Sequence, residues 1–277
     1  MKRRMNLGGY YRIAGFWLSG CLCLLPATVV FAEEGDTMTH AAKVAQKIQV
    51  KLTPQIQVPL SDNYNRKVGA NNNISQNQIQ LNPVIPIVIN QSDSIILNPM
   101  LTTNINKQNN NVTNQEAPFQ LATYFARTTA DWVYGAGPFI QLPAFNANGG
   151  SKQTGVGASY GLIYQPKHWV IGATAYNSWG AGRNLAGGTA NQFSITPLVS
   201  YTTDNAWTYN ISCQLVSNFS AGATSSTNQL TLSGGKTVKL GGRHWQLQAG
   251  PTYMLTTATG SPQGWGGYLS LTAMFME

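Results

Sequence analysis

Apolar and polar residues alternate one by one along much of this chain, most plainly after residue 190. In the segment 191–202, for example, Phe193, Ile195 and Val199 are separated from one another by polar residues such as Ser194. Successive side chains of a β-strand point to opposite faces, so such a strand has one apolar and one polar face. Only 9% of the residues are charged, whereas soluble domains average about 25%. The sequence therefore predicts strands whose apolar face meets something less polar than water.

The same pattern recurs from residue 52 to the end of the chain. It predicts about twelve strands, at residues 52–60, 77–89, 94–105, 118–127, 131–143, 153–165, 168–179, 191–202, 205–217, 227–239, 244–257 and 263–276. Most of these exceed the roughly 9–11 residues that a tilted strand needs to cross a bilayer, and no apolar run after Ala32 approaches the roughly 20 residues of a spanning helix. We therefore expect an all-β fold, a transmembrane antiparallel up-and-down β-barrel over residues 52–277.

The connections between these strands alternate in length. Short connections are expected near residues 90–93, 128–130, 166–167, 203–204 and 240–243. Long connections, rich in Asn, Gly and Ser, are expected at residues 61–76, 106–117, 144–152, 180–190 and 218–226. Barrels of the bacterial outer membrane have short periplasmic turns and longer outside loops. The alternation therefore predicts a place in the bacterial cell outer membrane.

The N-terminus has the composition of an export signal. Residues 1–12 carry four basic residues and no acidic residue, and an almost wholly apolar stretch follows up to Ala32. Val30 and Ala32 then occupy the −3 and −1 positions of a cleavage site. We therefore expect cleavage before Glu33 and a signal peptide at residues 1–32.

Two alternatives to this cleavage stay open. The apolar stretch is nearly long enough to act as an uncleaved membrane anchor, and the sequence Leu-Ser-Gly-Cys that ends at Cys21 resembles a lipoprotein box. The lead-in that follows, residues 33–51, is assigned to the periplasm. It contains a short helix, because Ala41, Val44 and Ile48 fall on one helical face. So short a helix is marginal alone and needs a surface to dock on.

A tryptophan recurs just after four of the short connections. Trp132, Trp169, Trp207 and Trp245 each open a strand, and they are 37 or 38 residues apart. One hairpin per repeat brings these indoles to the same level around the barrel. Aromatic residues gather where a barrel meets the membrane–water interface. We therefore expect these four residues to form an interfacial aromatic girdle.

The polar faces of the predicted strands are expected to line the barrel interior. The candidate lumen-lining residues are Gln80, Asn98, Tyr124, Tyr176, Thr196, Asn210, Gln248 and Tyr268. All are neutral hydrogen-bonding groups, whereas charge-selective pores use rings of charged side chains. A barrel of twelve strands is also wider than one of eight, whose interior side chains can fill. The pattern therefore favours the passage of small neutral solutes.

The sequence does not indicate an enzyme. Gly157, Ser159 and Gly161 match the G-x-S-x-G pattern of hydrolase nucleophiles, but that serine needs a turn into a helix, and here the alternation continues. After cleavage only Cys213 remains, so no intrachain disulfide and no cysteine metal site can form. We expect no catalytic residue, no metal and no cofactor. The basic residues are scattered, which argues against a nucleic-acid partner.

Several short motifs also follow one another in a fixed order. They are Leu81-Asn82-Pro83-Val84-Ile85-Pro86, Tyr134-Gly135-Ala136-Gly137-Pro138 after Trp132, Ile171-Gly172-Ala173 after Trp169, Gly235-Lys236, and a closing Phe275. As a set, over about residues 41–275, they resemble the meta-pathway phenol-degradation family of outer-membrane proteins, which are transporter-like. This chain differs from the family in ending with an acidic residue, Glu277, after the terminal aromatic. The resemblance implies an outer-membrane barrel for small solutes, including aromatic ones.

Two functions are compatible with these observations. The first is a channel or facilitator for small neutral solutes, including aromatic ones, with outer-membrane lipids, the solute and the barrel-assembly machinery as partners. The second is a structural or surface-binding barrel with a plugged lumen, whose Asn-rich loops do the work. Conductance in a lipid bilayer separates the two.

Overall fold

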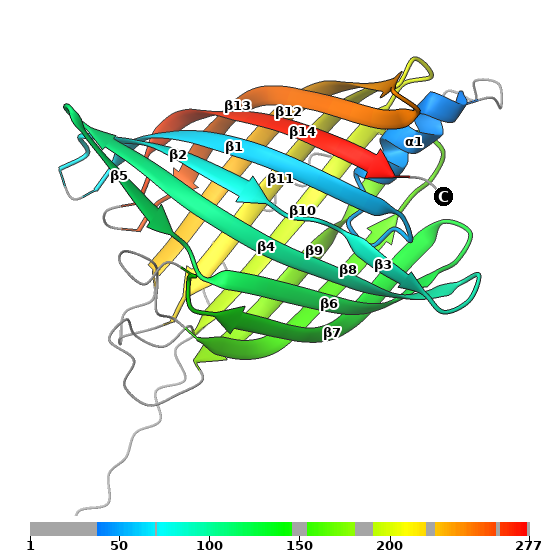
Figure 1. The fold of residues 1–277 in the computed structure, drawn as a ribbon, viewed down its shortest axis with the longest axis horizontal. Helices are drawn as coiled ribbons and strands as arrows, with labels where there is room; N and C mark the ends of the chain where they lie inside the picture. The colour runs from blue at the N-terminus through cyan, green and yellow to red at the C-terminus, as the bar shows by residue number, and fades with distance from the viewer. Residues whose placement is uncertain are drawn as a thin grey trace, which may run out of the picture. The chain divides into compact units, whose positions relative to one another are not determined.

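The computed structural model describes residues 38–69, 71–145, 154–180, 191–219, 225–258 and 261–275. This part of the chain comprises one helix and fourteen strands (Figure 1). The elements are α1 (His40–Ile48), β1 (Ile56–Val68), β2 (Ile74–Leu81), β3 (Ile85–Val88), β4 (Asp93–Gln108), β5 (Asn111–Glu116), β6 (Phe119–Thr128), β7 (Trp132–Leu142), β8 (Gly155–Tyr164), β9 (Trp169–Gly180), β10 (Gln192–Thr202), β11 (Trp207–Asn218), β12 (Ser225–Leu240), β13 (Arg243–Thr256) and β14 (Gly264–Phe275). The predicted signal peptide, residues 1–32, lies outside the described residues.

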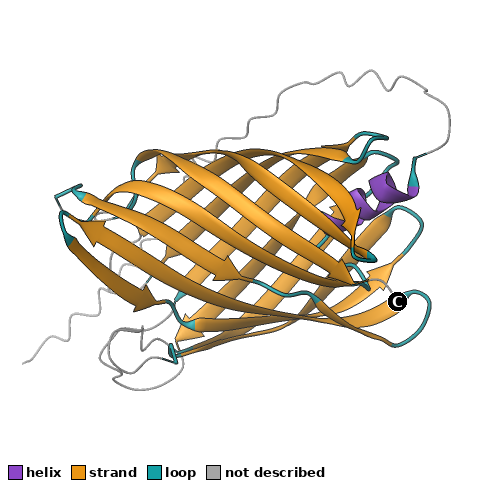
Figure 2. Cartoon of the chain, turned by 45° about the horizontal axis from the view of Figure 1, so that its top comes forward, coloured by secondary structure: helices purple, strands orange, loops and turns teal. Residues whose placement is uncertain are grey.

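The strands form one closed, antiparallel β-barrel (Figure 2). From β6 to β14 each strand pairs with its neighbours in sequence, β14 pairs with β1, and β1 pairs with β2. The pairing of β2 with β4 closes the ring. Because β3 continues the path of β2 along β4, and β5 continues that of β6, the fourteen strands occupy twelve positions. The prediction of a twelve-stranded up-and-down barrel with a short N-terminal helix is confirmed.

The strand boundaries differ from the prediction mainly in the first third of the chain. From residue 119 onwards the predicted ends agree with the structure to within two residues. By contrast, β1 continues to Val68, so most of the loop expected at 61–76 is strand. The loop expected at 106–117 is a hairpin between β4 and β5. These stretches are rich in Asn, Gln and Ser on both faces, so they pair as strands without showing the alternation that identifies a strand.

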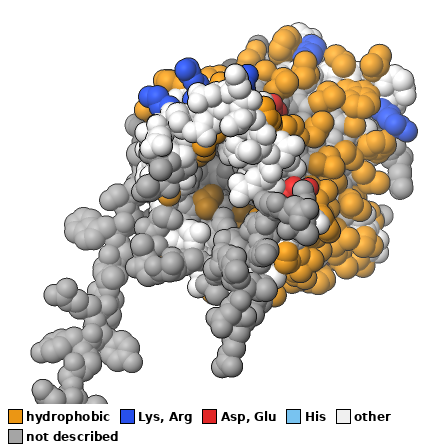
Figure 3. Space-filling model, turned by 60° about the vertical axis from the view of Figure 1, so that its left-hand side comes forward, with side chains coloured by type: hydrophobic (Ala, Val, Ile, Leu, Met, Phe, Trp, Pro, Cys, Tyr) orange, Lys and Arg blue, Asp and Glu red, His pale blue; other side chains and the backbone are white. Residues whose placement is uncertain are grey.

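The apolar residues of the alternating pattern face away from the barrel axis. Ile211, Leu247 and Leu269 are each more than half exposed on the outer wall, and hydrophobic side chains gather on the outer surface at the right of Figure 3. A soluble protein rarely exposes an apolar area of this extent, whereas a membrane barrel carries such a band against lipid. In the described part of the chain no helix is long and apolar enough to cross a bilayer.

Helix α1 lies at the end of the barrel that carries the short connections, which we call the short-turn end (Figure 1). Its N-cap is Thr39, whose hydroxyl oxygen accepts a hydrogen bond from the Ala42 amide at 3.2 Å. The same hydroxyl donates to the carbonyl of Asp204, at 2.6 Å, in the turn between β10 and β11. Gln46 donates its side-chain amide to the carbonyls of Lys167 and Trp169 at the start of β9. The barrel thus supplies the docking surface that so short a helix needs.

Candidate functional site

The candidate site is a cavity of about 280 Å³ inside the barrel. All eight residues predicted to line the lumen lie on its wall: Gln80, Asn98, Tyr124, Tyr176, Thr196, Asn210, Gln248 and Tyr268. The pleat explains this placement, because the neighbours of these residues in each strand point outward. Their contact with a passing solute stays a prediction.

One wall of the cavity is polar. It is formed mainly by β10 to β14, which contribute neutral residues such as Thr196, Ser212, Ser233 and Ser270. A hydroxyl or an amide can both donate and accept hydrogen bonds. This wall can therefore hydrogen-bond a solute without selecting for one sign of charge.

The polar wall also holds the lead-in by a small hydrogen-bond network centred on Gln49. The side-chain oxygen of Gln49 accepts hydrogen bonds from the amides of Asn210, at 2.8 Å, and Gln248, at 3.3 Å. Its side-chain nitrogen donates to Gln246 at 2.8 Å. Two of the predicted lumen residues, Asn210 and Gln248, therefore bind the lead-in as well as lining the cavity.

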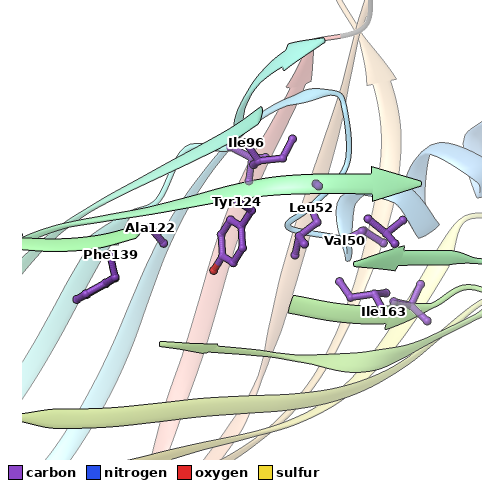
Figure 4. Close-up of a cluster of buried hydrophobic side chains, with 11 residues drawn as sticks. Val50, Leu52, Ile96, Ala122, Tyr124, Phe139 and Ile163 are labelled. Carbon is purple, nitrogen blue, oxygen red and sulfur yellow. The ribbon is translucent and has the colours of Figure 1, made fainter. Parts of the chain in front are cut away.

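The opposite side of the barrel interior carries a buried apolar and aromatic cluster, which we call the apolar wall (Figure 4). The ring of Tyr176 stacks on that of Phe139, with centroids 4.3 Å apart and planes only 9° from parallel. Around this pair lies a buried cluster from β4 and β6 to β9: Ile96, Ala122, Tyr124, Ala126, Val133, Phe139, Ile163 and Val170. Apart from Tyr124, these inward-facing apolar residues were not predicted from the sequence. The only signal for them is that a few stretches, such as residues 95–97 and 169–171, are apolar on both faces of the strand.

Because β1 begins only at Ile56, the lead-in of the structure extends to residue 55 and includes Leu52, which was predicted to belong to the first strand. It packs on this apolar wall. Val50 and Leu52, which precede β1, belong to the same buried cluster and have almost no exposed surface. Leu52 occupies the space opposite Gly161 on β8, where a methyl group added to the glycine would lie 2.8 Å from the two methyl carbons of Leu52. Residues 33–51 were predicted as a periplasmic lead-in that precedes the barrel. Within the part of it that the structure describes, Ile48, Gln49 and Lys51 line the cavity, and its place in the periplasm stays a prediction.

This packing predicts the effect of adding one methyl group to the barrel wall. In Gly161→Ala the new Cβ must displace Leu52, and we expect a loss of about 1–3 kcal/mol, as is typical of overpacked cores. The measurement is the urea midpoint of the folded band on gels. Gly267→Ala is the matched control, since a Cβ there meets no atom within 4 Å. Equal midpoints for both variants would contradict the role assigned to Gly161.

The hydroxyl of Ser159, between Gly157 and Gly161, binds the backbone of neighbouring strands and has a structural role. The side chain is fully buried, and its oxygen lies 2.6 Å from the carbonyl oxygen of Thr123 and 3.2 Å from that of Gly137, so its proton is shared between two backbone acceptors. A nucleophilic serine requires a base within hydrogen-bond reach and access to substrate. In the described part of the chain, moreover, no group of three His, Cys, Asp or Glu residues is placed to hold a metal ion.

The four tryptophans of the predicted girdle all lie at the short-turn end. Trp132, Trp169 and Trp207 begin β7, β9 and β11, and Trp245 lies two residues into β13. Trp132 and Trp207 are more than two-fifths exposed on the outer wall. The ammonium group of Lys236 lies 5.3 Å from the ring centre of Trp207. These positions suit a membrane–water boundary, and contact of the four indoles with lipid stays a prediction.

Taken with the apolar outer wall, the closed barrel and its internal cavity define an outer-membrane β-barrel of the channel-like class. Among solved structures, the chain is similar to the COG4313 outer membrane channel from Pseudomonas putida F1, with 12% identity, a TM-score of 0.63, and coverage of 80% of this chain and 95% of that one. It also aligns with the NanC porin at 13% identity and a TM-score of 0.48, over 79% of this chain and 100% of that one. No family model and no curated protein matches the sequence. At these identities the similarity shows the shared fold alone.

Proposed function

We propose that this protein is an outer-membrane channel for small solutes that carry an apolar or aromatic part. The observation that carries the proposal is the mixed lining of the cavity. Tyr124, Tyr176 and Leu198 line it together with many neutral hydrogen-bonding groups. A solute with a ring and a polar substituent can therefore find a partner for each of its parts.

The dimensions of the cavity fit this class of solute. An apolar cavity of about 150 Å³ is large enough to hold benzene, and the volume here is about 280 Å³. Tyr124 and Tyr176 line the cavity with aromatic rings, against which another ring can pack in an offset or edge-to-face geometry. The site therefore suits single-ring compounds better than long chains or polymers.

Sequence features support the remaining parts of the proposal. A signal peptide at residues 1–32 delivers the chain to the periplasm, from which the barrel-assembly machinery inserts it beside outer-membrane lipids. The resemblance to the meta-pathway phenol-degradation family supports an aromatic solute. Outer-membrane barrels have their short turns on the periplasmic side, so the short-turn end, which carries α1, faces the periplasm.

The direct test is electrical. The purified protein, added to a planar lipid bilayer in potassium chloride, is expected to produce discrete steps of ion current. Single-ring solutes that enter the cavity are expected to interrupt this current. The absence of any current, both in the wild type and in a variant whose lead-in has been released, would overturn the channel function.

The second candidate function is a structural or surface-binding barrel with a plugged lumen. The observation that favours it is the position of the lead-in. Its Gln49 is hydrogen-bonded to the polar wall, and its Leu52 packs on the apolar wall. A plug held at both walls is compatible with a barrel that never conducts. The same bilayer measurement separates the two functions, since this one predicts no current under either condition.

A further inference from the structure

One charged side chain lies on the wall of the cavity. Of the described residues that line the cavity, Lys51 alone carries a charge, and all the others are neutral. The sequence predicted neutral solutes because it assigned residue 51 to a segment outside the barrel. The structure instead brings this ammonium group into the lumen, among the residues that face the cavity.

The position of Lys51 is set by its two neighbours. Val50 and Leu52 are both buried in the apolar cluster, whereas the side chain of Lys51 is exposed to the cavity. Because Val50 and Leu52 anchor the backbone on either side, Lys51 cannot leave the lumen unless the lead-in is released. The backbone of Lys51 is therefore held at the cavity.

The acidic residues of the described part of the chain lie elsewhere. Asp93 pairs with Arg127 at 2.7 Å, and Asp131 and Asp204 lie in short turns. Asp62 accepts a hydrogen bond from Asn77 at 2.7 Å, and Glu116 ends β5. None of the five lines the cavity. Within the described residues, Lys51 has neither an ion pair nor a hydrogen bond.

An ammonium group without a counter-charge inside a barrel is costly, and such residues commonly mark the path of a substrate. A bound anion offsets that cost and supplies the ion-pair partner that the described residues do not provide.

We propose that Lys51 and the aromatic wall together form a binding site for an aromatic monocarboxylate. The carboxylate is bound by the Lys51 ammonium group, and the ring packs against the side of the cavity that carries Tyr124 and Tyr176. This inference rests on the proposed function, because it names the class of solute for the same cavity. It also replaces the sequence-based expectation of a neutral solute by that of an organic monoanion.

Benzoate and benzamide form the matched pair of probes, since they share a ring and differ in charge. Isothermal titration calorimetry of the detergent-solubilised protein is expected to show tighter binding of benzoate. A charge-assisted hydrogen bond contributes enough to change affinity about tenfold or more. We therefore expect Lys51→Gln to weaken benzoate binding by about that factor and to leave benzamide binding unchanged. Lys51→Arg keeps the charge and is expected to keep the preference.

Lys43→Gln is the control, because it removes the same charge from an exposed position on α1. Wild-type benzoate affinity in Lys51→Gln, or no benzoate binding to the wild type, would overturn the inference. These outcomes are distinct from failure of the channel, which is measured separately as ion current. Current without a benzoate preference rejects the solute class alone, and binding without current rejects the channel function alone.

Discussion

Ile211→Lys is expected to impair insertion and to destabilise the folded barrel by about 2–4 kcal/mol, the range for a lysine on the lipid face near the midplane. Ile211 lies near the middle of β11, and 54% of its surface is exposed on the outer wall. Its partners on the neighbouring strands, Val199 and Leu232, face outward with it. A lysine there would place its charge in the hydrocarbon region.

Ser212→Lys is the matched variant one residue further on. Ser212 lines the cavity, so the same charge points into the lumen, and the variant is expected to fold like the wild type. A one-residue step exchanges the two faces of a strand. Heat-modifiable migration on gels and urea unfolding in phospholipid vesicles measure the difference. Equal stability of the two variants would mean that the assignment of inner and outer faces is wrong.

Releasing the lead-in is expected to raise the single-channel conductance severalfold. In the double variant Val50→Asp/Leu52→Asp, two carboxylates replace side chains that are buried in the apolar cluster. A buried charge without a partner is strongly unfavourable, so the segment is expected to leave the short-turn end of the lumen. Planar-bilayer recording measures the conductance, and limited proteolysis between α1 and β1 reports the release itself.

Lys43→Asp is the control for this variant, because it adds an acidic residue on the exposed side of α1. It is expected to keep the wild-type conductance and protease resistance. If proteolysis shows that the lead-in is released and the conductance does not rise, the cavity is not the path of the ions.

The repetitive part of the fold was predictable from the sequence because the membrane imposes a simple rule on each strand. In β10, Phe193 and Val199 face outward and Ser194 faces the lumen, so alternation alone identifies both the strand and the face on which each residue lies. In β1 that rule fails beyond Leu60. There Asp62 and Asn63 lie on opposite faces, and both are polar. Only pairing with β2 and β14, which is a long-range property, shows that this stretch is a strand.

The site was predictable only for residues that follow the same rule. Thr196 and Gln248 are polar residues between apolar ones, and both face the cavity. Phe139 and Ile163 face inward although they are apolar, because the lead-in covers that part of the wall. The pattern of a single strand carries no information about what packs against it. For the same reason the sequence placed Lys51 outside the barrel.

The contacts of Gln49 also constrain the order in which the molecule assembles. Its partners Asn210, Gln246 and Gln248 lie 161 to 199 residues further along the chain. Gln49 is therefore synthesised well before β11 and β13, the strands whose side chains hold it. The pairing of β1 with β14 must also wait for the end of the chain, because it joins the first strand to the last. Contacts so distant in sequence form slowly, so we expect closure of the ring and seating of the lead-in to be the late steps of biogenesis.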